Sequence, residues 1–386
     1  MIALVDCNSF FCSVERVFHP GLWNKPVCVL SNNDGIIVAL TPEAKKIGLH
    51  RGDPIFKMKD IVSANNVAVF SGNMYLYAAM SRRIVSILKK SVSKIENYSI
   101  DESFCYLDGY DDPEGMMREI ANKIKIWTDI PVSVGIAPSK TLAKMGSKFA
   151  KNYKGYRDVC FIDSEEKRRK ALELFDLADV WGIGGRTYTK LRTLGIDTPL
   201  QLADKKESWI RNHFTKPILQ TWMELNGVPC IDTAEKLKKQ TISTSRCFGE
   251  MVSDLPSLKA SIATFASSVA NKLRAQGSVC SEISVFISSN TFRDDLEQYG
   301  NWSSYRFLSP TCDTIELVEA ANSILEKIYK PGIRYKRSGV WVSGIVDASP
   351  IQYNLFDPIT NRPERASLMK TIDRINQRYG LKTVQL

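Results

Sequence analysis

The chain is 386 residues long and 44% hydrophobic, which is enough for two or three domains with their own cores. Lys and Arg outnumber Asp and Glu by 52 to 42, and the net charge of +10 favours an anionic partner such as nucleic acid. Nine cysteines without a C-x-x-C pair argue against a disulfide framework and a Cys-type zinc site, and three histidines leave little for histidine-based metal or triad chemistry. Free thiols indicate a reducing cytoplasm.

The first elements expected along the chain are a buried strand, a helix and a hairpin. Residues 1–6 form an apolar run that ends at Asp6, and residues 8–18 place apolar side chains on one face of a helix. Apolar runs at 27–30 and 36–40 flank an Asn-Asp-Gly turn, which indicates a hairpin. The N-terminus lacks a basic segment and carries an acid within its apolar run, so we expect neither a signal peptide nor a membrane span.

Strands and helices alternate in the next part of the chain. Helices are expected at 80–88 and 114–127, and the run 132–136 is typical of a strand. Between the two helices, the runs 94–100 and 103–107 are rich in aromatic and β-branched residues and indicate a hairpin. This mixture predicts one α+β sheet domain.

Three acids stand out against these elements. Asp101 and Glu102 fall at or near the tip of the second hairpin, and Asp6 ends the first strand. Acids brought together repel one another, and two divalent cations bridged by carboxylates, about 3.5–4 Å apart, would remove that repulsion and suit phosphoryl transfer. For an isolated Asp-Glu pair, the alternative is two unrelated surface acids.

From about residue 164 the sequence becomes helical and charged. A Trp-Gly-Ile-Gly-Gly segment precedes a helix expected at 187–194. Glycines just before a helix let backbone N–H groups approach a phosphate closely, and the helix dipole favours the anion. Gly182, Gly184 and Gly185 are therefore candidate phosphate contacts, with an ordinary tight turn as the alternative.

Residues 233–240 are typical of a linker, and a second set of strands and helices follows it. Strands are expected at 282–288 and 338–344, and helices at 258–275 and 314–329. The tail has four apolar residues at the spacing of a short amphipathic helix: Leu368, Ile372, Ile375 and Tyr379.

Three basic residues lie beside the last expected strand, namely Arg334, Lys336 and Arg337. Their position predicts a strand edge that contacts phosphates. A solvated strand edge is the alternative.

Several motifs, in order along the chain, resemble those of Y-family translesion DNA polymerases, and of the bacterial UmuC-type branch in particular. Two of them correspond to the palm signatures of the family: 6–12 (DCNSFFC) and 98–103 (YSIDES). The others lie at 31–35 (SNNDG), 43–48 (EAKKIG), 52–54 (GDP), 180–184 (VWGIG), 245–250 (SRCFGE) and 354–357 (NLFD). A series of this kind, spread across the chain, is highly specific.

The resemblance implies an α+β multidomain fold shaped as a right hand. It places a palm at 1–165 with small fingers inserted at about 20–72, and a helical thumb with a helix-hairpin-helix at 166–235. It also implies an α/β little finger domain that binds DNA at 240–348, and a C-terminal tail at 349–386.

The resemblance also implies roles for individual residues. Asp6, Asp101 and Glu102 would be the catalytic acids that coordinate two Mg²⁺ ions, helped by the backbone carbonyl of Cys7. One ion would activate the primer 3′-hydroxyl, and the other would hold the nucleotide triphosphate and stabilise the departing pyrophosphate.

Four residues would form the nucleotide site: Phe10, Phe11, Lys45 and Lys151. Phe11 corresponds to the steric gate that excludes a ribose 2′-hydroxyl, and packing on an apolar helix face is its alternative or additional role. Lys45 stands where other branches carry an arginine and cannot form a bidentate clamp. Pro42 stands where those branches carry a tyrosine that binds the triphosphate, so this contact is absent and the affinity for nucleotide is in question.

The tail segment around Gln352, Leu355 and Phe356 resembles the bacterial peptide that binds the sliding clamp. An apolar linker with two buried hydrophobes is the alternative. UmuC-type chains usually continue beyond the position of Leu386, so the sequence is expected to be either truncated or a short variant.

The function implied is error-prone translesion DNA synthesis during the DNA damage response. Its partners would be primer-template DNA, a nucleoside triphosphate and the sliding clamp, with a UmuD-type subunit and a RecA-type filament as further partners. One alternative is a non-catalytic protein that binds primer ends or recombinase filaments. A nucleotidyl cyclase is the other, but it would not need the glycine segment or the clamp peptide.

Overall fold

The computed structural model describes residues 1–32, 34–233, 238–351, 354–357, 359–380 and 383–384. The chain forms two compact units, Met1–Lys236 and Leu237–Leu386. All nine cysteines are free thiols. Within the described ranges, every helix is too short or too polar to cross a membrane.

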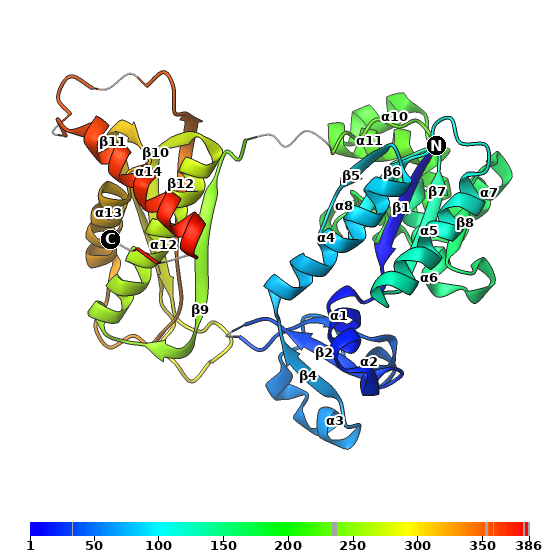
Figure 1. Ribbon diagram of the computed structural model, residues 1–386, viewed down its shortest axis with the longest axis horizontal. Coiled ribbons are helices and arrows are strands. Elements are labelled where there is room, and N and C mark those ends of the chain that lie inside the picture. The colour runs from blue at the N-terminus through cyan, green and yellow to red at the C-terminus, as the bar shows by residue number, and fades with distance from the viewer. Residues whose placement is uncertain (33, 234–237, 352–353, 358, 381–382, 385–386) are drawn as a thin grey trace. The chain divides into compact units, whose positions relative to one another are not determined.

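The centre of the first unit is a five-stranded sheet with the order β5-β6-β1-β7-β8 (Figure 1). Its strands are β1 Ile2–Cys7, β5 Lys94–Asn97, β6 Glu102–Tyr106, β7 Val132–Ala137 and β8 Val159–Phe161. The middle strand, β1, pairs in antiparallel fashion with both β6 and β7. The expected first strand, acidic hairpin and later strand are therefore confirmed, whereas β8 was not predicted.

Helices cover both faces of this sheet. The residues of β1 alternate, so that Ala3 and Val5 pack with α4 (Met74–Ser91) and α5 (Pro113–Thr128), while Ile2 and Leu4 pack with α6 (Lys140–Asn152). The sequence did not predict α6.

Helix α6 packs unusually closely on β7. A Cβ atom at Gly135 of β7 would lie 2.0 Å from the carbonyl oxygen of Ala143, and one at Gly146 of α6 would lie 3.0 Å from Gly135 Cα. Only glycine is compatible with such an approach of two backbones.

A smaller sheet, β3-β2-β4, lies at one end of the five-stranded sheet. Its strands are β2 Val27–Leu30, β3 Ile37–Leu40 and β4 Ala68–Ser71, and β2 and β3 form the expected antiparallel hairpin. Helix α1 (Phe10–Phe18) connects β1 to this sheet, which carries the short helices α2 (Pro42–Lys46) and α3 (Lys59–Ala64). The sheet has its own small core, which includes Cys28, Ile37 and Leu49.

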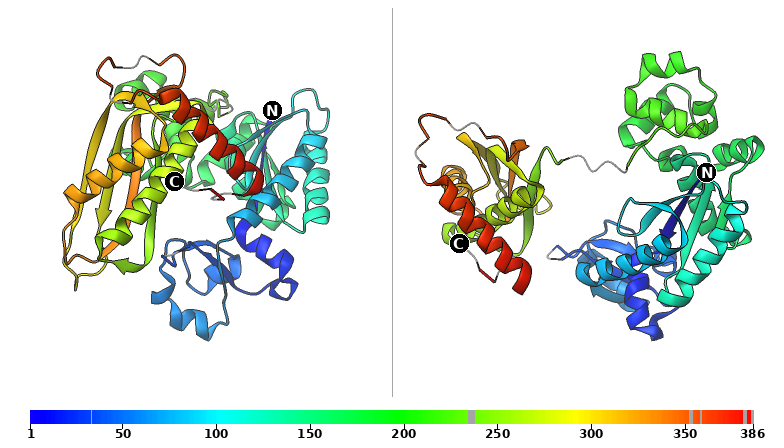
Figure 2. Two further views of the ribbon diagram at one scale, coloured as in Figure 1. Left: turned by 60° about the vertical axis from the view of Figure 1, so that its left-hand side comes forward. Right: turned by 45° about the horizontal axis from the view of Figure 1, so that its top comes forward.

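A helical lobe lies at the opposite end of the first unit (Figure 2). Its helices are α7 Glu165–Leu174, α8 Gly185–Thr193, α9 Pro199–Ala203, α10 Glu207–His213 and α11 Lys216–Leu225. Their apolar side chains share one core with α6, so the lobe is continuous with the α6 face of the sheet.

The second unit is a four-stranded antiparallel sheet with the order β11-β10-β12-β9 and two helices on one face. The strands are β9 Ile242–Val252, β10 Ser278–Ser288, β11 Gly300–Thr311 and β12 Tyr335–Asp347, and the helices are α12 Leu255–Gln276 and α13 Thr314–Ile328. The two central strands and both helices were predicted, but the edge strands β9 and β11 were not. The expectation that Arg334, Lys336 and Arg337 mark an edge is wrong, because β12 pairs with both β10 and β9.

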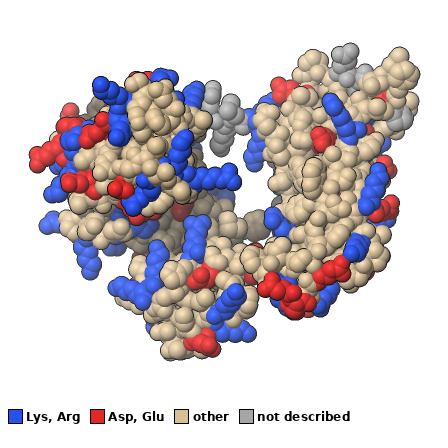
Figure 3. All heavy atoms as spheres, turned by 180° about the vertical axis from the view of Figure 1, so that it is seen from behind, with Lys and Arg blue, Asp and Glu red and all other residues tan. Residues whose placement is uncertain are grey.

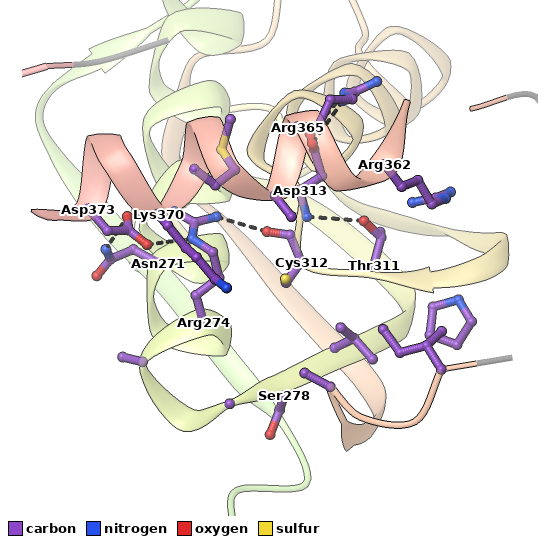
Figure 4. Close-up of a pocket in the computed structure, with 18 of the residues that line it drawn as sticks. Asn271, Arg274, Ser278, Thr311, Cys312, Asp313, Arg362, Arg365, Lys370 and Asp373 are labelled. Atoms are coloured by element: carbon purple, nitrogen blue, oxygen red, sulfur yellow. Dashed lines mark hydrogen bonds and ion pairs between the residues drawn. The ribbon is translucent and has the colours of Figure 1, made fainter. Parts of the chain in front are cut away.

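The tail forms helix α14 (Arg362–Tyr379), which confirms the expected helix. Ile372 and Ile375 are partly buried. Leu368 and Tyr379 are exposed, whereas Met369 is buried. Ion pairs dominate the docking (Figure 4): Arg274 binds Asp373 with bonds of 2.6 and 2.8 Å, and Arg365 binds Asp313 with two bonds of 2.9 Å.

Basic side chains are spread over both units on the face drawn in Figure 3, and acidic side chains lie among them. The net charge of +10 is therefore not gathered into a single patch on that face.

We expect the docking of α14 to depend on the charge of Asp373. Burial alone would raise the pKa of Asp373, but the hydrogen bonds and charge of Arg274 outweigh it and lower the pKa. The contribution of the Asp373–Arg274 pair to stability is therefore complete above the ordinary aspartate pKa of about 3.9. It is lost as the pH falls through the lowered pKa of Asp373. Asp373→Asn should loosen the helix at neutral pH, which the NMR signal of the buried Met369 methyl group would report. Asp295→Asn, which removes an exposed partner of Arg293, should leave this signal unchanged; a Met369 signal insensitive to Asp373→Asn would contradict the ionic docking.

Candidate active site

Asp6 and Glu102 lie directly opposite each other on neighbouring strands. They are register partners in the β1–β6 pair, so their side chains point to the same face of the sheet. This is the face covered by α6, because the residues two positions away, Leu4 and Phe104, belong to the core that α6 shares. Two of the three predicted acids are therefore neighbours.

Asp101 occupies the turn that leads into β6. Its carboxylate accepts a hydrogen bond of 2.5 Å from the Ser99 hydroxyl, and its backbone carbonyl accepts one of 2.9 Å from the backbone N–H of Cys7. Asp101 also lines a small cavity with Val5 and Ile84, on the side of α4. The turn thus brings Asp101 close to the end of β1.

Lysines of α6 neutralise the two neighbouring acids. Lys151 Nζ lies 3.3 Å from Asp6 Oδ1, and Lys144 forms an ion pair with Glu102. Burial raises the pKa of Asp6, Lys151 opposes that rise, and the nearby charges of Glu102 and Asp101 add to it. Lys151 was predicted as a nucleotide contact, whereas Lys144 was missed. The sequence feature that could have indicated Lys144 is a row of lysines at helical spacing: Lys140, Lys144, Lys148 and Lys151.

The acids supply the ligands that a divalent cation such as Mg²⁺ prefers, namely carboxylate oxygens. Burial is the main cause of the raised pKa of Asp6, and the nearby carboxylates of Glu102 and Asp101 add to it. Among the described residues, however, no three Asp, Glu, His or Cys side chains already converge on one point as a metal site would require. The lysine ammonium groups supply the compensating positive charge instead.

Phe11 stacks on a tyrosine of α4. The rings of Phe11 and Tyr77 are 4.5 Å apart and inclined by 16°. Tyr77 is fully buried, and its hydroxyl donates a 2.6 Å hydrogen bond to the buried carboxylate of Glu15, one turn after Phe11 on α1. The Phe11 ring therefore has a defined position, supported by two residues that the sequence did not single out.

The other predicted nucleotide residues lie on either side of Phe11. Phe10 is buried in the core, so packing accounts for its side chain. Lys45 is exposed on α2. Glu43, on the same helix, forms a 2.9 Å ion pair with Arg16 of α1. Lys45 is thus available to an anion, and Phe10 is not.

The predicted glycine segment forms the entry to α8. Gly182 has φ +93°, and a Cβ there would lie 2.4 Å from the hydroxyl oxygen of Thr221, so the turn requires glycine. Gly184 is the N-cap residue of α8 without a side-chain cap, and Gly185 is the first helical residue. The first N–H groups of α8 are therefore free of a side-chain partner, as a phosphate contact would require.

The three basic residues of the second unit have different surroundings. The pairing of β12 with β9 is irregular between Tyr335 and Arg337, so Lys336 lies at a break in the strand register. Lys336 Nζ donates a 2.5 Å hydrogen bond to the carbonyl of Phe248, while Arg337 lies over the ring of Phe286, 5.3 Å from its centroid. Arg334 is exposed and precedes β12.

In the tail, Leu355 and Phe356 are 91% and 81% exposed, which contradicts the alternative of a linker with two buried hydrophobes. Gln352 lies outside the described residues.

Comparison with solved structures identifies the class of protein. A Y-family DNA polymerase chimera matches with a TM-score of 0.69 at 23% identity, covering 90% of this chain and 100% of that chain. The chain therefore has the fold of a Y-family DNA polymerase, with palm, fingers, thumb and little finger.

Sequence comparison then identifies the family. The chain belongs to the impB/mucB/samB family, whose model matches residues 5–148 and whose C-terminal domain model matches residues 239–355. Protein UmuC of Salmonella typhimurium is 39% identical over 100% of this chain and 92% of its own length. DNA polymerase IV of Dehalococcoides mccartyi is 27% identical over 99% of this chain and 95% of its own length.

Proposed function

We propose that the chain is a template-directed, error-prone DNA polymerase that performs translesion synthesis during the DNA damage response. The observation that carries this proposal is the pairing of Asp6 with Glu102 beside Asp101, in a chain of the impB/mucB/samB family. The reaction would join a nucleoside triphosphate to a primer 3′-hydroxyl and release pyrophosphate.

Asp6, Asp101 and Glu102, with the backbone carbonyl of Cys7, would hold two Mg²⁺ ions. When bound, these ions would lower the pKa of the primer hydroxyl and stabilise the charge on the triphosphate. Lys151 would orient the triphosphate from α6, and exposed Lys45 would meet it from the fingers. Phe11, supported by Tyr77, would exclude a ribose 2′-hydroxyl by occupying the space that it needs.

We assign the palm to 1–165 with the fingers at about 20–72, the thumb to 166–235, the little finger to 240–348 and the tail to 349–386. The loop of Gly182, Gly184 and Gly185 would contact the phosphates of the duplex without reading sequence. In the little finger, Arg334 and Arg337 are better placed than Lys336, whose ammonium is engaged by backbone carbonyls.

The partners proposed are primer-template DNA, a deoxynucleoside triphosphate and a sliding clamp bound by the segment of Gln352, Leu355 and Phe356. A UmuD-type subunit and a RecA-type filament are further proposed partners, in the cytoplasm. No specific observation favours the non-catalytic alternative. A protein of that kind would not require three acids at the ends of β1 and β6.

The catalytic assignment predicts the effect of removing an acid. Asp101→Ala or Glu102→Ala should nearly abolish primer extension while leaving DNA binding within a few-fold, because these residues hold metal and do not contact the duplex. Primer-extension rates with and without Mg²⁺, and fluorescence anisotropy of labelled DNA, measure the two effects. Asp111→Ala, which changes an exposed acid of the same domain, is the control. Substantial extension by either variant would disprove the metal assignment.

The gate assignment predicts a change in sugar selection. Phe11→Ala should raise ribonucleotide insertion relative to deoxyribonucleotide insertion, because it opens space without removing a catalytic group. Single-nucleotide insertion kinetics give the ratio of kcat/KM values for the two sugars. Phe18→Ala removes an exposed ring from the same helix and should not alter the ratio. An unchanged ratio in Phe11→Ala would leave Phe11 as a packing residue only.

The tail assignment predicts a loss of clamp stimulation. Replacing Leu355 and Phe356 by alanine should leave synthesis on a bare primer-template unchanged. It should remove stimulation by a loaded clamp, since burying each side chain is worth roughly 1.5–3 kcal/mol. The matched control replaces Leu174 and Phe292, which are similarly exposed. Full stimulation of the Leu355/Phe356 variant, together with no clamp binding by a peptide of residues 351–358, would reject this role.

A further inference from the structure

Lys144 sits in an aromatic cage of its own chain. Its ammonium lies 4.6 Å from the ring centroid of Tyr98 and 5.4 Å from that of Trp181, while it pairs with Glu102. The two rings meet edge to face at 5.4 Å. Faces of Tyr and Trp rings attract an ammonium group, most strongly where water is partly excluded.

The cage is assembled from separate parts of the first unit. Tyr98 belongs to the turn that carries Asp101, and Trp181 immediately precedes the glycine segment of the thumb. Both rings rest near Phe104, which is fully buried, at centroid distances of 5.7 and 6.2 Å. The ammonium is therefore held by a supported surface and not by a single flexible partner.

The next lysine of the row provides a contrast. Lys148, one turn along α6, pairs with Asp179, and its side chain is 41% exposed. The side chains of Lys144 and Glu102 are 20% and 19% exposed. Partial burial strengthens the interaction of Lys144 with Glu102, because solvent screens it less.

We propose that Lys144, positioned by Tyr98 and Trp181, acts as a built-in counter-cation of Glu102 that sets how tightly the three acids bind a divalent cation. A cation that approaches Glu102 must compete with the ammonium, which the two rings hold beside the carboxylate. Lys144 is thus a positioning residue, and Trp181 links its position to the thumb. The proposal rests on the proposed role of the acids as metal ligands.

The test is a titration of the full chain with Ca²⁺, without DNA or nucleotide, followed by isothermal calorimetry. Lys144→Met should bind Ca²⁺ about tenfold more tightly than the parent, because a positive charge within a few ångströms has been removed. Lys148→Met is the matched control and should bind as the parent does. Unchanged or weaker binding by Lys144→Met, with the fold intact by circular dichroism, would overturn the proposal.

Cage variants provide a second, independent measurement. Trp181→Leu should shift Ca²⁺ affinity in the same direction as Lys144→Met but by less, and Trp181→Phe should restore most of the parent value because it keeps an aromatic face. Tryptophan emission should change on Ca²⁺ addition in the parent, and this change should disappear in Trp181→Phe and in Lys144→Met. If Trp181→Leu binds Ca²⁺ as the parent does, and the parent emission does not change on Ca²⁺ addition, the cage does not position Lys144.

Acid variants separate this proposal from the proposed function. Glu102→Gln and Asp101→Asn should weaken Ca²⁺ binding in the parent background. If they do not, the acids are not the metal ligands and the proposed catalytic site fails as well. If they do, but Lys144→Met leaves the affinity unchanged, only the role of Lys144 fails.

Discussion

The contact between two backbones at Gly135 and Gly146 fixes how closely α6 packs on the five-stranded sheet. It lets α6 lie against β7 without intervening side chains, since a Cβ at Gly135 would stand 2.0 Å from a helix carbonyl. Because β1 is the next strand, the lysines of α6 reach acids on β1 and β6 that a more distant helix would not reach. The core on the same face continues into the thumb helices, so the contact also determines where Trp181 lies relative to Glu102. A substitution at Gly135 would therefore disturb the site without changing any residue in it.

Much of the fold follows from local patterns, and the differences have identifiable causes. The apolar run of β1 and the aromatic and β-branched runs of the acidic hairpin gave clear strand signals. The edge strands β9 and β11 gave none, because Ser, Thr and charged residues alternate with few hydrophobes where one face is open. Of the four apolar residues predicted to mark one face of α14, Ile372 and Ile375 are partly buried, whereas Leu368 and Tyr379 are exposed, so apolar spacing indicated only part of the contact. Here Arg365 and Asp373 form the contact, around the single buried Met369.

The acids of the site could be predicted from the sequence because they lie within short motifs that resemble the signatures of a known family. Their partners were not, since Lys144, Tyr77 and Trp181 gain significance only from tertiary contacts. Tyr77 is separated from Glu15 by 62 positions, and Lys144 from Glu102 by 42. A sequence without aligned relatives offers no local signal that joins such residues. The lysine spacing of α6 is visible in the sequence, but it does not indicate that this helix lies against the acids.

The tail helix and the acids near the end of β1 are paired with different cations, and the chemistry of the side chains explains the difference. The tail helix is held by arginines, whose planar guanidinium groups bind carboxylates in pairs of hydrogen bonds, as Arg274 and Arg365 do. Such contacts fix one geometry. The acids of the palm are faced by lysines, whose single ammonium group on a flexible stem can shift without breaking a bidentate fork. A carboxylate that must exchange its counter-ion during a reaction cycle is better served by lysine, and a helix that must stay docked is better served by arginine. Lys144 and Lys151 lie beside Glu102 and Asp6, as expected for carboxylates that exchange a lysine ammonium for another cation.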